Sequence, residues 1–450
     1  MPSNILFILC DQMRADALAY APNVRGLAER GVQFANCYSA APLCQPARAC
    51  IATGRFPTEH GVCGNMNEPI SPEMRADTYM SRLQEAGWHT ALIGKHHFID
   101  RFNVGMDVTE DDEEIRGFGF DHVWQVVDVY ESLHNDDRFT QMLRERGELG
   151  QWRERVRGEG QRFYRELAPE ETIDGYIGER AVAYIRDYDP VAPLYLNVGF
   201  VGPHPPYWTP AEYADRLDPD DLPPPKGVEN PDEIQRCRQR RATYYGAVQL
   251  IDDYVGRLVE ALADRGVLEE TLIVFAADHG DMLGDFDIWD KRWFYDQSAR
   301  VPLVMAGPGI EPDPRLGGIT CKRLVSSLDL YPTLLQAAGV ERSDADGREG
   351  ISLIDAAADR GPRRERVFSE LGTATMVRDA SFKLVFDPEQ GGVQQLFDLR
   401  RDPQELQNLA GEPGYEPVEK RLVEAMLSHL TRLTRRTHEK EQNRVQRVRV

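Results

Sequence analysis

The sequence predicts an α/β protein with a large, doubly wound, mixed β-sheet flanked by helices, followed by a smaller C-terminal α+β domain with an antiparallel sheet. Continuous apolar runs recur, each followed by a polar residue, which is typical of buried parallel strands whose carboxyl ends meet at one crevice. An amphipathic helix lies between two of these runs, so that strand, helix and strand alternate. After about residue 345 this pattern gives way to short strands separated by a Gly-Gly pair, which indicates a hairpin.

Four apolar runs predict four strands of the large sheet. Each run ends shortly before a residue that can bind a ligand or a metal, so we expect these polar residues to share one site. The predicted helix covers residues 248–262 and ends near Gly266. The runs and the polar residues after them are 5–9 with Asp11, 90–94 with Lys95, 194–198 with His204, and 272–275 with Asp278.

The remaining segments complete the predicted organisation. Residues 100–190 are charged and helical in pattern, and we expect them to form an insertion over the carboxyl edge of the sheet that sets substrate selectivity. Residues 381–386 and 395–399 form the predicted hairpin. An amphipathic helix at 418–433 precedes a charged tail that is either frayed or an oligomer contact. We therefore expect a catalytic domain over 1–345 and a C-terminal domain over 346–450.

The charge of the chain limits its partners. The sequence has 53 basic and 74 acidic residues, a net charge of −21, which disfavours long nucleic acids and anionic membranes. A small anionic ester would need a local cluster of cations. Only seven of the basic residues are lysines, so a lysine within a motif carries weight.

The cysteines and the N-terminus predict a cytoplasmic protein. The seven cysteines show no CxxC pair and no regular spacing, which favours thiols in a reducing compartment. Residues 1–4 lack a basic segment, and the apolar run 5–10 is too short for a signal peptide. No segment approaches the roughly 20 apolar residues that span a membrane. The cysteines are Cys10, Cys37, Cys44, Cys50, Cys63, Cys237 and Cys321.

The segment Leu-Cys-Gln-Pro-Ala-Arg at residues 43–48 is the most informative motif. Pro46 fits the first turn of a helix, so we expect Cys44 at a helix N-terminus and the end of that helix near Gly54. Backbone N–H groups and the positive end of the helix dipole would stabilise negative charge beside Cys44.

This segment resembles the Leu-Cys-x-Pro-x-Arg pattern of type I sulfatases in the alkaline phosphatase superfamily. Further motifs of that family follow in the same order along nearly the whole chain, which implies an alkaline phosphatase-like fold. They are Asp11 to Asp16, Arg55-x-Pro57-x-x-His60-Gly61, Gly94-Lys95-His96-His97-Phe98, Pro203-His204-Pro205-Pro206, Ala277 to Asp281 with Leu283-Gly284, Lys291, and Leu396 to Leu409.

The resemblance implies a modified nucleophile and a metal. A formylglycine-generating enzyme would oxidise Cys44 to Cα-formylglycine (3-oxoalanine); in the hydrate, one hydroxyl attacks sulfur and the other later expels sulfate. The implied metal is Ca²⁺, with Mn²⁺ or Mg²⁺ left open because His279 adds nitrogen and Gln12 replaces a frequent second Asp. The implied metal ligands are Asp11, Gln12, Cys44, Asp278 and His279.

The resemblance also implies roles for the surrounding side chains. Lys95 and Lys291 would bind the sulfuryl oxygens, because a tetrahedral anion suits ammonium donors. His204 or Lys291 would give a proton to the leaving alcohol, and His97 would take the proton from the second hydroxyl. Arg48 would hold a hydroxyl of the hydrate or the metal-bound oxygen. We assign no role to His96.

Three functions remain open at this stage, and a sulfatase that acts on a small sulfate ester is the first. A phosphonate monoester hydrolase or phosphodiesterase on the same scaffold is its rival, since those relatives also pair Asp with Gln and Asp with His. A non-catalytic sulfate-ester-binding protein is the third. The alcohol stays open among aryl, choline and sugar, because Gln12 with residues 94–98 resembles choline sulfatases and residues 203–206 resemble carbohydrate sulfatases.

Overall fold

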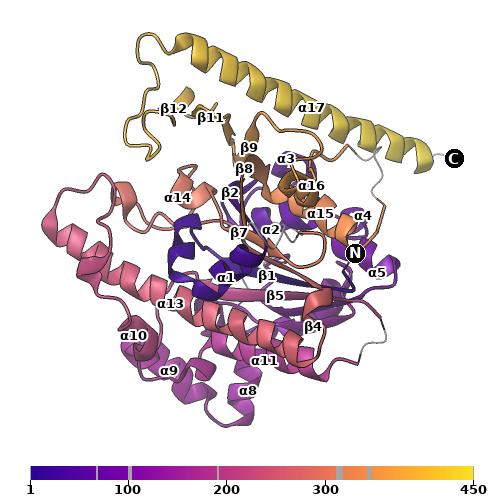
Figure 1. Cartoon of the computed structure of the whole chain (residues 1–450), viewed down its shortest axis with the longest axis vertical. Helices are drawn as coiled ribbons and strands as arrows, with labels where there is room; N and C mark the ends of the chain where they lie inside the picture. Colours follow the sequence, from indigo (N-terminus) through magenta and orange to yellow (C-terminus); the bar gives the residue numbers. More distant parts are fainter. Residues whose placement is uncertain are drawn as a thin grey trace.

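The computed structural model describes residues 2–66, 69–99, 104–189, 192–310, 318–341 and 347–448. Its centre is an eight-stranded sheet with strand order β4-β3-β5-β1-β6-β7-β2-β8 (Figure 1). The strands are β1 Asn4–Asp11, β2 Val32–Tyr38, β3 His89–Gly94, β4 His122–Gln125, β5 Leu194–Pro203, β6 Thr271–Ala277, β7 Leu303–Ala306 and β8 Ile319–Ser326.

The four predicted strands are neighbours in the middle of this sheet. They are β3, β5, β1 and β6, and each pairs in parallel with the next, so their carboxyl ends lie at one edge. All seven β1 residues from Ile5 to Asp11 are buried, which explains the unbroken apolar run. β7 runs antiparallel to both β6 and β2, so the sheet is mixed as predicted.

Helices cover both faces of the sheet, which confirms the doubly wound architecture. α11 and the long α13 pack together against β5 on one face, and α2, α5 and α15 lie on the other (Figure 1). The helices are α1 Pro22–Arg30, α2 Cys44–Thr53, α3 Pro57–His60, α4 Pro72–Arg75, α5 Tyr79–Glu85, α6 Asp112–Arg116, α7 Val129–Ser132, α8 Arg138–Glu145, α9 Leu149–Glu159, α10 Gln161–Tyr164, α11 Ile173–Asp187, α12 Ala211–Ala214, α13 Pro231–Asp264, α14 Asp296–Ala299, α15 Leu330–Ala337, α16 Leu353–Ala357 and α17 Glu416–Val448.

Two helices are longer than their apolar periodicity predicts. α13 begins at Pro231, where the Asn230 side chain accepts hydrogen bonds from the first turn, and the polar start of the helix is largely exposed. α17 continues from the predicted helix 418–433 through the charged tail as far as Val448. Periodicity marks only the stretch of a helix that packs against the protein, so it missed both extensions.

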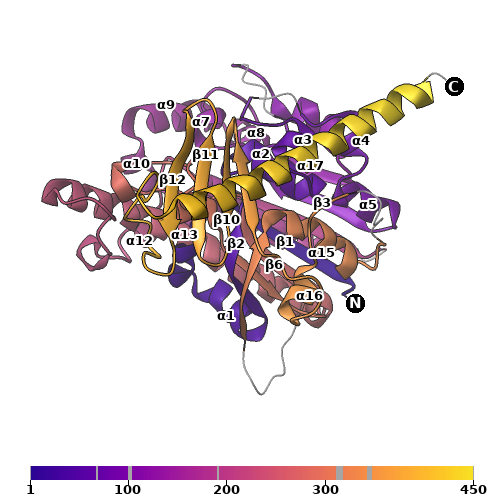
Figure 2. The same ribbon diagram turned by 90° about the horizontal axis from the view of Figure 1, so that it is seen from above.

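A separate four-stranded antiparallel sheet follows in the C-terminal part. Its strands are β9 Val367–Leu371, β10 Ala374–Arg378, β11 Phe382–Asp387 and β12 Gly392–Asp398, in the order β12-β11-β10-β9. The predicted hairpin is the β11–β12 pair. α17 lies across this sheet (Figure 2). Its apolar face packs there, with Leu422 and Met426 buried in one cluster with Val377 and Leu384.

The segment between β3 and β5 contributes helices α6 to α11 and one strand that the sequence analysis did not find. β4 extends the sheet beyond β3, with which it pairs in parallel. Its four residues are too few to show a strand pattern. Among the described residues, none of the helices combines the length and apolar character that a membrane-spanning segment requires.

Candidate active site

Two acidic side chains meet at the carboxyl edge of the large sheet. Asp11 is the last residue of β1, and Asp278 follows the last residue of β6. Because β1 and β6 are adjacent parallel strands in the register Cys10 to Ala277, they deliver both carboxylates to one place. Both side chains are completely buried.

Cys44 is the first residue of α2, as predicted, and the helix ends at Thr53. Gly54 terminates it in the left-handed conformation with φ 64°, where a Cβ would lie 2.8 Å from the Tyr331 ring, so the turn requires glycine. All ten residues of α2 are buried. The N-terminus of this buried helix therefore presents Cys44 to the two carboxylates.

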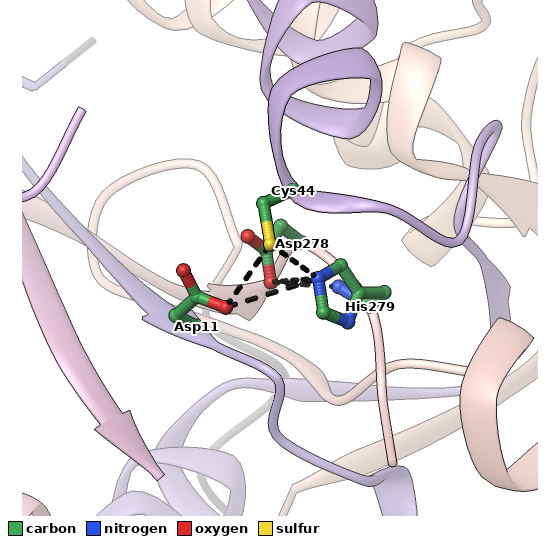
Figure 3. A group of neighbouring side chains, drawn as sticks. All are labelled: Asp11, Cys44, Asp278 and His279. Atoms are coloured by element: carbon green, nitrogen blue, oxygen red, sulfur yellow. Dashed lines mark hydrogen bonds and ion pairs between the residues drawn. The ribbon is translucent and has the colours of Figure 1, made fainter. Parts of the chain in front are cut away.

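His279 completes a compact cluster with these three residues (Figure 3). Its Nε2 lies 3.2 Å from Cys44 Sγ, 3.8 Å from Asp11 Oδ1 and 3.7 Å from Asp278 Oδ1. Cys44 Sγ is 3.7 Å from Asp11 Oδ1. One potential ligand atom from each of the four side chains falls within 4.8 Å of all the others.

Arg48 and Lys95 bind the far side of the two carboxylates. The Arg48 Nε donates to Asp278 Oδ2 at 2.9 Å, and its Nη2 lies 3.3 Å from Asp11 Oδ2. The Lys95 Nζ lies 2.8 Å from Asp11 Oδ2 and 3.3 Å from Asp128 Oδ2. Burial and the Cys44 thiolate favour a protonated Asp11, but Lys95, His204 and Arg48 outweigh them and lower the pKa of Asp11.

The same surroundings favour a charged group at position 44. Burial alone would raise the pKa of the Cys44 thiol. The ammonium of Lys291, together with His279 and the contact with His204, instead lowers that pKa well below its usual value. The structure contains Cys44 as a cysteine, so its sulfur occupies the place that an oxidised side chain would take.

Lys291 and His204 come from separate loops and contact each other beside Cys44. The Lys291 Nζ lies 2.7 Å from His204 Nε2. The His204 Nδ1 is 2.6 Å from the carbonyl oxygen of Pro205 and therefore carries the proton, which leaves Nε2 to accept from the lysine. Both residues thus lie where the sequence analysis expected them, at the same site.

The Gln12 side chain faces Lys291. Its Oε1 accepts from Lys291 Nζ at 2.9 Å, while its Nε2 donates to Asp281 at 2.6 Å and to Asp290 at 2.7 Å. The backbone of Gln12 has φ 67°, and its N–H donates to Asp278. The predicted role of Gln12 as a metal ligand stays a prediction, and the contact with Lys291 is a feature that the sequence did not indicate.

The two adjacent histidines after β3 differ in their surroundings. His96 is buried, accepts from the Phe98 N–H at 3.0 Å and lies 2.9 Å from Gln125 Oε1. Burial lowers the pKa of His96 to about 4, so the ring is a neutral structural group. His97 has φ 54° and lines the same pocket as Lys95 and His204.

The donor set at the strand ends fits a divalent cation. Asp11 turns Oδ2 to the cations and Oδ1 toward Cys44 and His279, so one carboxylate oxygen faces the centre of the cluster. Buried carboxylates and one imidazole suit a hard or borderline metal such as Ca²⁺, Mn²⁺ or Mg²⁺. Arg48 donates to Asp278, to Asp11 and to the Lys95 carbonyl oxygen, and so holds both carboxylates in place.

Two further acidic residues support the site and were absent from the sequence analysis. Asp128 caps α7 and pairs with Lys95. Asp174 in α11 accepts hydrogen bonds from the N–H groups of Val201 and Gly202, at 2.8 and 3.0 Å, directly before the His204 loop. An aspartate directly before a helix, such as Asp128, can be recognised in the sequence as a helix cap. Its pairing with Lys95 depends on the tertiary fold, which the sequence pattern does not show.

A pocket of about 290 Å³ opens beside this cluster. Cys44, Lys95, His97 and His204 line it at the cluster end. Residues from 99 to 135 supply most of the other walls, consistent with the expectation that the predicted insertion 100–190 contributes to selectivity.

Comparison with known proteins gives one consistent result. Residues 3–340 match the family model described as Sulfatase, and residues 284–432 match the model of the N-sulphoglucosamine sulphohydrolase C-terminal region. The chain is 32% identical to a choline-sulfatase of Rhizobium meliloti, over 91% of this chain and 83% of that protein. It is 29% identical to an arylsulfatase of Clostridium perfringens, over 92% of each.

The comparison with solved structures gives a related neighbour. The phosphonate monoester hydrolase of Agrobacterium radiobacter superposes with a TM-score of 0.79, at 25% identity and over 96% of each chain. The similarity extends over both sheets, because almost the whole of each chain is covered.

Proposed function

Because this chain belongs to the sulfatase family of sulfuric ester hydrolases in the alkaline phosphatase superfamily, we propose that it hydrolyses a small sulfuric ester through a nucleophile made from Cys44. One observation carries the proposal. Cys44 lies at the N-terminus of a buried helix, with His279 at 3.2 Å and with Lys291 and Lys95 among the charges around it. This arrangement combines a nucleophile position with a binding site for an anion.

Residue 44 is the proposed nucleophile once a formylglycine-generating enzyme has oxidised it. Formylglycine as its hydrate would supply one hydroxyl that attacks sulfur and a second hydroxyl whose deprotonation releases sulfate. The α2 N-terminus stabilises negative charge on that side chain. Burial of Cys44, at 1% exposure in the folded protein, agrees with oxidation before folding is complete.

Asp11, Asp278 and His279 are the residues that would hold the metal together with residue 44, and Gln12 is the fifth candidate. The metal would supply positive charge that activates the nucleophile and neutralises sulfuryl oxygens. Arg48 fixes both carboxylates through its two contacts, so we propose a positioning role for it. We keep Ca²⁺ as first choice, with Mn²⁺ and Mg²⁺ as alternatives.

Lys95 and Lys291 are the proposed donors to the sulfuryl oxygens. Burial would lower the pKa of Lys95, but Asp11 and Asp128 raise it, so the ammonium keeps its charge inside the protein. The pKa of Lys291 is raised as well, despite burial, by Cys44 and Asp11. Two fixed ammonium groups therefore meet the charge that develops on the transferred group.

His204 is the proposed general acid and His97 the proposed general base. Because Lys291 Nζ contacts His204 Nε2, the lysine can protonate His204, which then gives the proton to the leaving oxygen, or it can give the proton to that oxygen directly. His97 lines the pocket near residue 44, where it would accept the proton of the second hydroxyl. After these two transfers the Lys291–His204 pair has one proton fewer and His97 one proton more, so both groups exchange a proton with water before the next turnover.

A phosphonate monoester hydrolase is the second candidate function. The similarity to the Agrobacterium radiobacter enzyme and the pairing of Asp11 with Gln12 support it. The Lys95 and His97 positions support the sulfatase instead, because both resemble the sulfatase motif.

Two measurements on one preparation of the protein test this proposal. Mass spectrometry of the tryptic peptide 31–48 reports whether residue 44 is formylglycine. The same preparation is then assayed with 4-nitrophenyl sulfate and with an aryl phosphonate monoester, and Cys44→Ala serves as the inactive control. We expect formylglycine and a higher kcat/KM for the sulfate; a higher kcat/KM for the phosphonate would select the second function.

A further inference from the structure

We infer that the alcohol part of the substrate is a compact group with an apolar body and no second anionic substituent. This inference rests on the proposed function and narrows it to a substrate class. It is carried by the size, the apolar wall and the charges of the pocket beside Cys44.

The size of the pocket limits the substrate to little more than one ring. Its volume is about 290 Å³, whereas an apolar cavity of about 150 Å³ already holds benzene. The end near Cys44, Lys95 and His204 must take the sulfuryl group. The remaining volume suits a single ring or a short branched chain, and an extended oligosaccharide would have to lie outside the pocket.

Part of the pocket lining is apolar. This apolar wall is formed by Ile99, Met106, Val108, Ile115 and Val126, which come from the connection between β3 and β4 and from the residue directly after β4. Ile115 and Val126 are almost fully buried, so this wall is part of the core and keeps its shape. A group that is polar all round would lose hydrogen bonds to water here without replacement.

The charged residues of the pocket disfavour a second anion. Among the described residues that line it, three carry carboxylates, one carries an ammonium, and three are histidines. The ammonium of Lys95 already pairs with Asp11 and Asp128. The Glu131 carboxylate accepts from Asn135 at 2.8 Å. A carboxylate or second sulfate on the alcohol would face Asp111, Asp128 and Glu131, whereas a neutral or cationic alcohol would not be repelled.

The test compares substrates first. The probes are 4-nitrophenyl sulfate, whose alcohol part is neutral, choline sulfate, whose alcohol part is cationic, and a monosaccharide disulfate, whose alcohol part carries a second sulfate. With residue 44 verified as formylglycine, we expect kcat/KM for one or both of the first two to exceed that for the disulfate by about 10-fold or more. A preference for the disulfate would overturn the inference.

The test then changes the wall. Val108→Phe fills the pocket, and Val104→Phe is the matched control because Val104 is 82% exposed and does not line it. We expect Val108→Phe to reduce kcat/KM for 4-nitrophenyl sulfate by about 10-fold, mainly through KM, and the control to stay within about twofold. Met106→Trp, at a half-buried position, repeats the test if the first variant folds poorly. Unchanged kinetics in a folded pocket variant would overturn the inference.

A third variant tests the effect of the negative charges in the pocket. Glu131→Gln keeps an oxygen that can accept from Asn135 but removes one negative charge from the wall. We expect the ratio of kcat/KM for the disulfate to that for 4-nitrophenyl sulfate to rise about threefold or more. If the modified wild-type enzyme cleaves no sulfate ester, the proposed function and this inference fall together. If it cleaves them with the opposite selectivity, only the inference falls.

Discussion

The Lys291 ammonium lies 2.7 Å from His204 Nε2, and the imidazole carries its own proton on Nδ1. Transfer of one proton from the Lys291 ammonium to His204 Nε2 would therefore give a doubly protonated imidazole. Lys291 also contacts Gln12, and the Gln12 N–H contacts Asp278, so the Lys291–His204 pair is connected to the cluster of Asp11, Cys44, Asp278 and His279. The proposed proton donors and the residues around Cys44 are thus linked by one continuous set of hydrogen bonds.

His204→Asn should impair esters with poor leaving groups most, because they need a proton from the enzyme as the ester bond breaks. We expect kcat for an alkyl sulfate to fall by about 10² to 10³-fold, with a smaller loss for 4-nitrophenyl sulfate. The measurement is kcat for a series of esters of graded leaving-group pKa. His89→Asn is the control, because His89 is the first residue of β3, whereas the site lies at the carboxyl ends of the strands. An equal loss for all leaving groups would argue against a role as general acid.

The sequence predicted those parts of the site that follow directly from regular structure. Asp11 and Asp278 could be placed together because apolar runs identified their strands and parallel strands share an edge. Cys44 could be placed at a helix start because Pro46 and Gly54 mark the ends of α2. The roles of the lysines and histidines came from the family resemblance.

The contacts between loops could not be predicted in the same way. The Gln12 amide faces Lys291 because Asp281 and Asp290 hold its nitrogen, and these residues lie more than 260 positions along the chain. His429 is another case: it lies on an amphipathic helix with no local signal, yet it is buried between two glutamates from other segments. Such positions depend on tertiary packing, which periodicity and caps do not encode.

Lys383→Met should destabilise the protein strongly. The Lys383 Nζ is fully buried, donates to the Phe294 carbonyl oxygen at 3.0 Å, and pairs with Asp296 and Glu405. Removing the lysine leaves two carboxylates without their buried cation, which costs about 3–5 kcal/mol in the free energy of unfolding. Urea unfolding monitored by fluorescence measures the loss.

The control for this variant is Lys420→Met. Lys420 is 78% exposed and its Nζ lies 4.0 Å from Glu424, so its removal should change the free energy of unfolding by less than about 0.5 kcal/mol. The two variants exchange the same side chains. A loss of similar size in both would mean that the buried cluster joining β11 to the Phe294–Asp296 segment adds little to stability.

Metal binding should stabilise the wild-type protein through Asp11 and Asp278. A metal that binds only the folded state adds about 2.7 kcal/mol when its free concentration is 100 times Kd. We expect Tm after chelation to rise on titration with Ca²⁺, Mn²⁺ or Mg²⁺, and the ion with the largest rise at equal concentration to be the preferred one. Thermal unfolding reports this without any assay of activity.

Asp278→Asn separates this site from nonspecific binding by the acidic surface. The variant should lose most of the metal-dependent rise in Tm, because one of two buried carboxylates is gone. Asp220→Asn, in the exposed acidic run at 218–221, should keep the full rise. Equal rises in all three proteins would place the metal elsewhere.

His429 should make stability decrease as the pH rises above about 6.5. Its ring is buried and stacks on Phe368 at 3.9 Å, and its two nitrogens lie 3.5 Å from Glu349 and 3.4 Å from Glu370. Burial lowers the pKa of His429, but the two carboxylates outweigh burial and raise it above its ordinary value. Arg432 and Arg436 also contact Glu349, which keeps that carboxylate ionised.

The sign of the pH dependence follows from the raised pKa of His429. Its charge stabilises the folded state fully below the unfolded pKa of about 6.5, and this contribution is lost as pH rises through the folded pKa. Glu349 has its pKa lowered to about 2, so its contribution changes only in acid, outside this range. The difference in free energy of unfolding between wild type and His429→Gln should therefore be largest below about pH 6.5 and shrink as the pH rises through the folded pKa of His429. Urea unfolding at each pH measures it, and a difference that is constant or grows with pH would show that the imidazole is neutral in the folded protein.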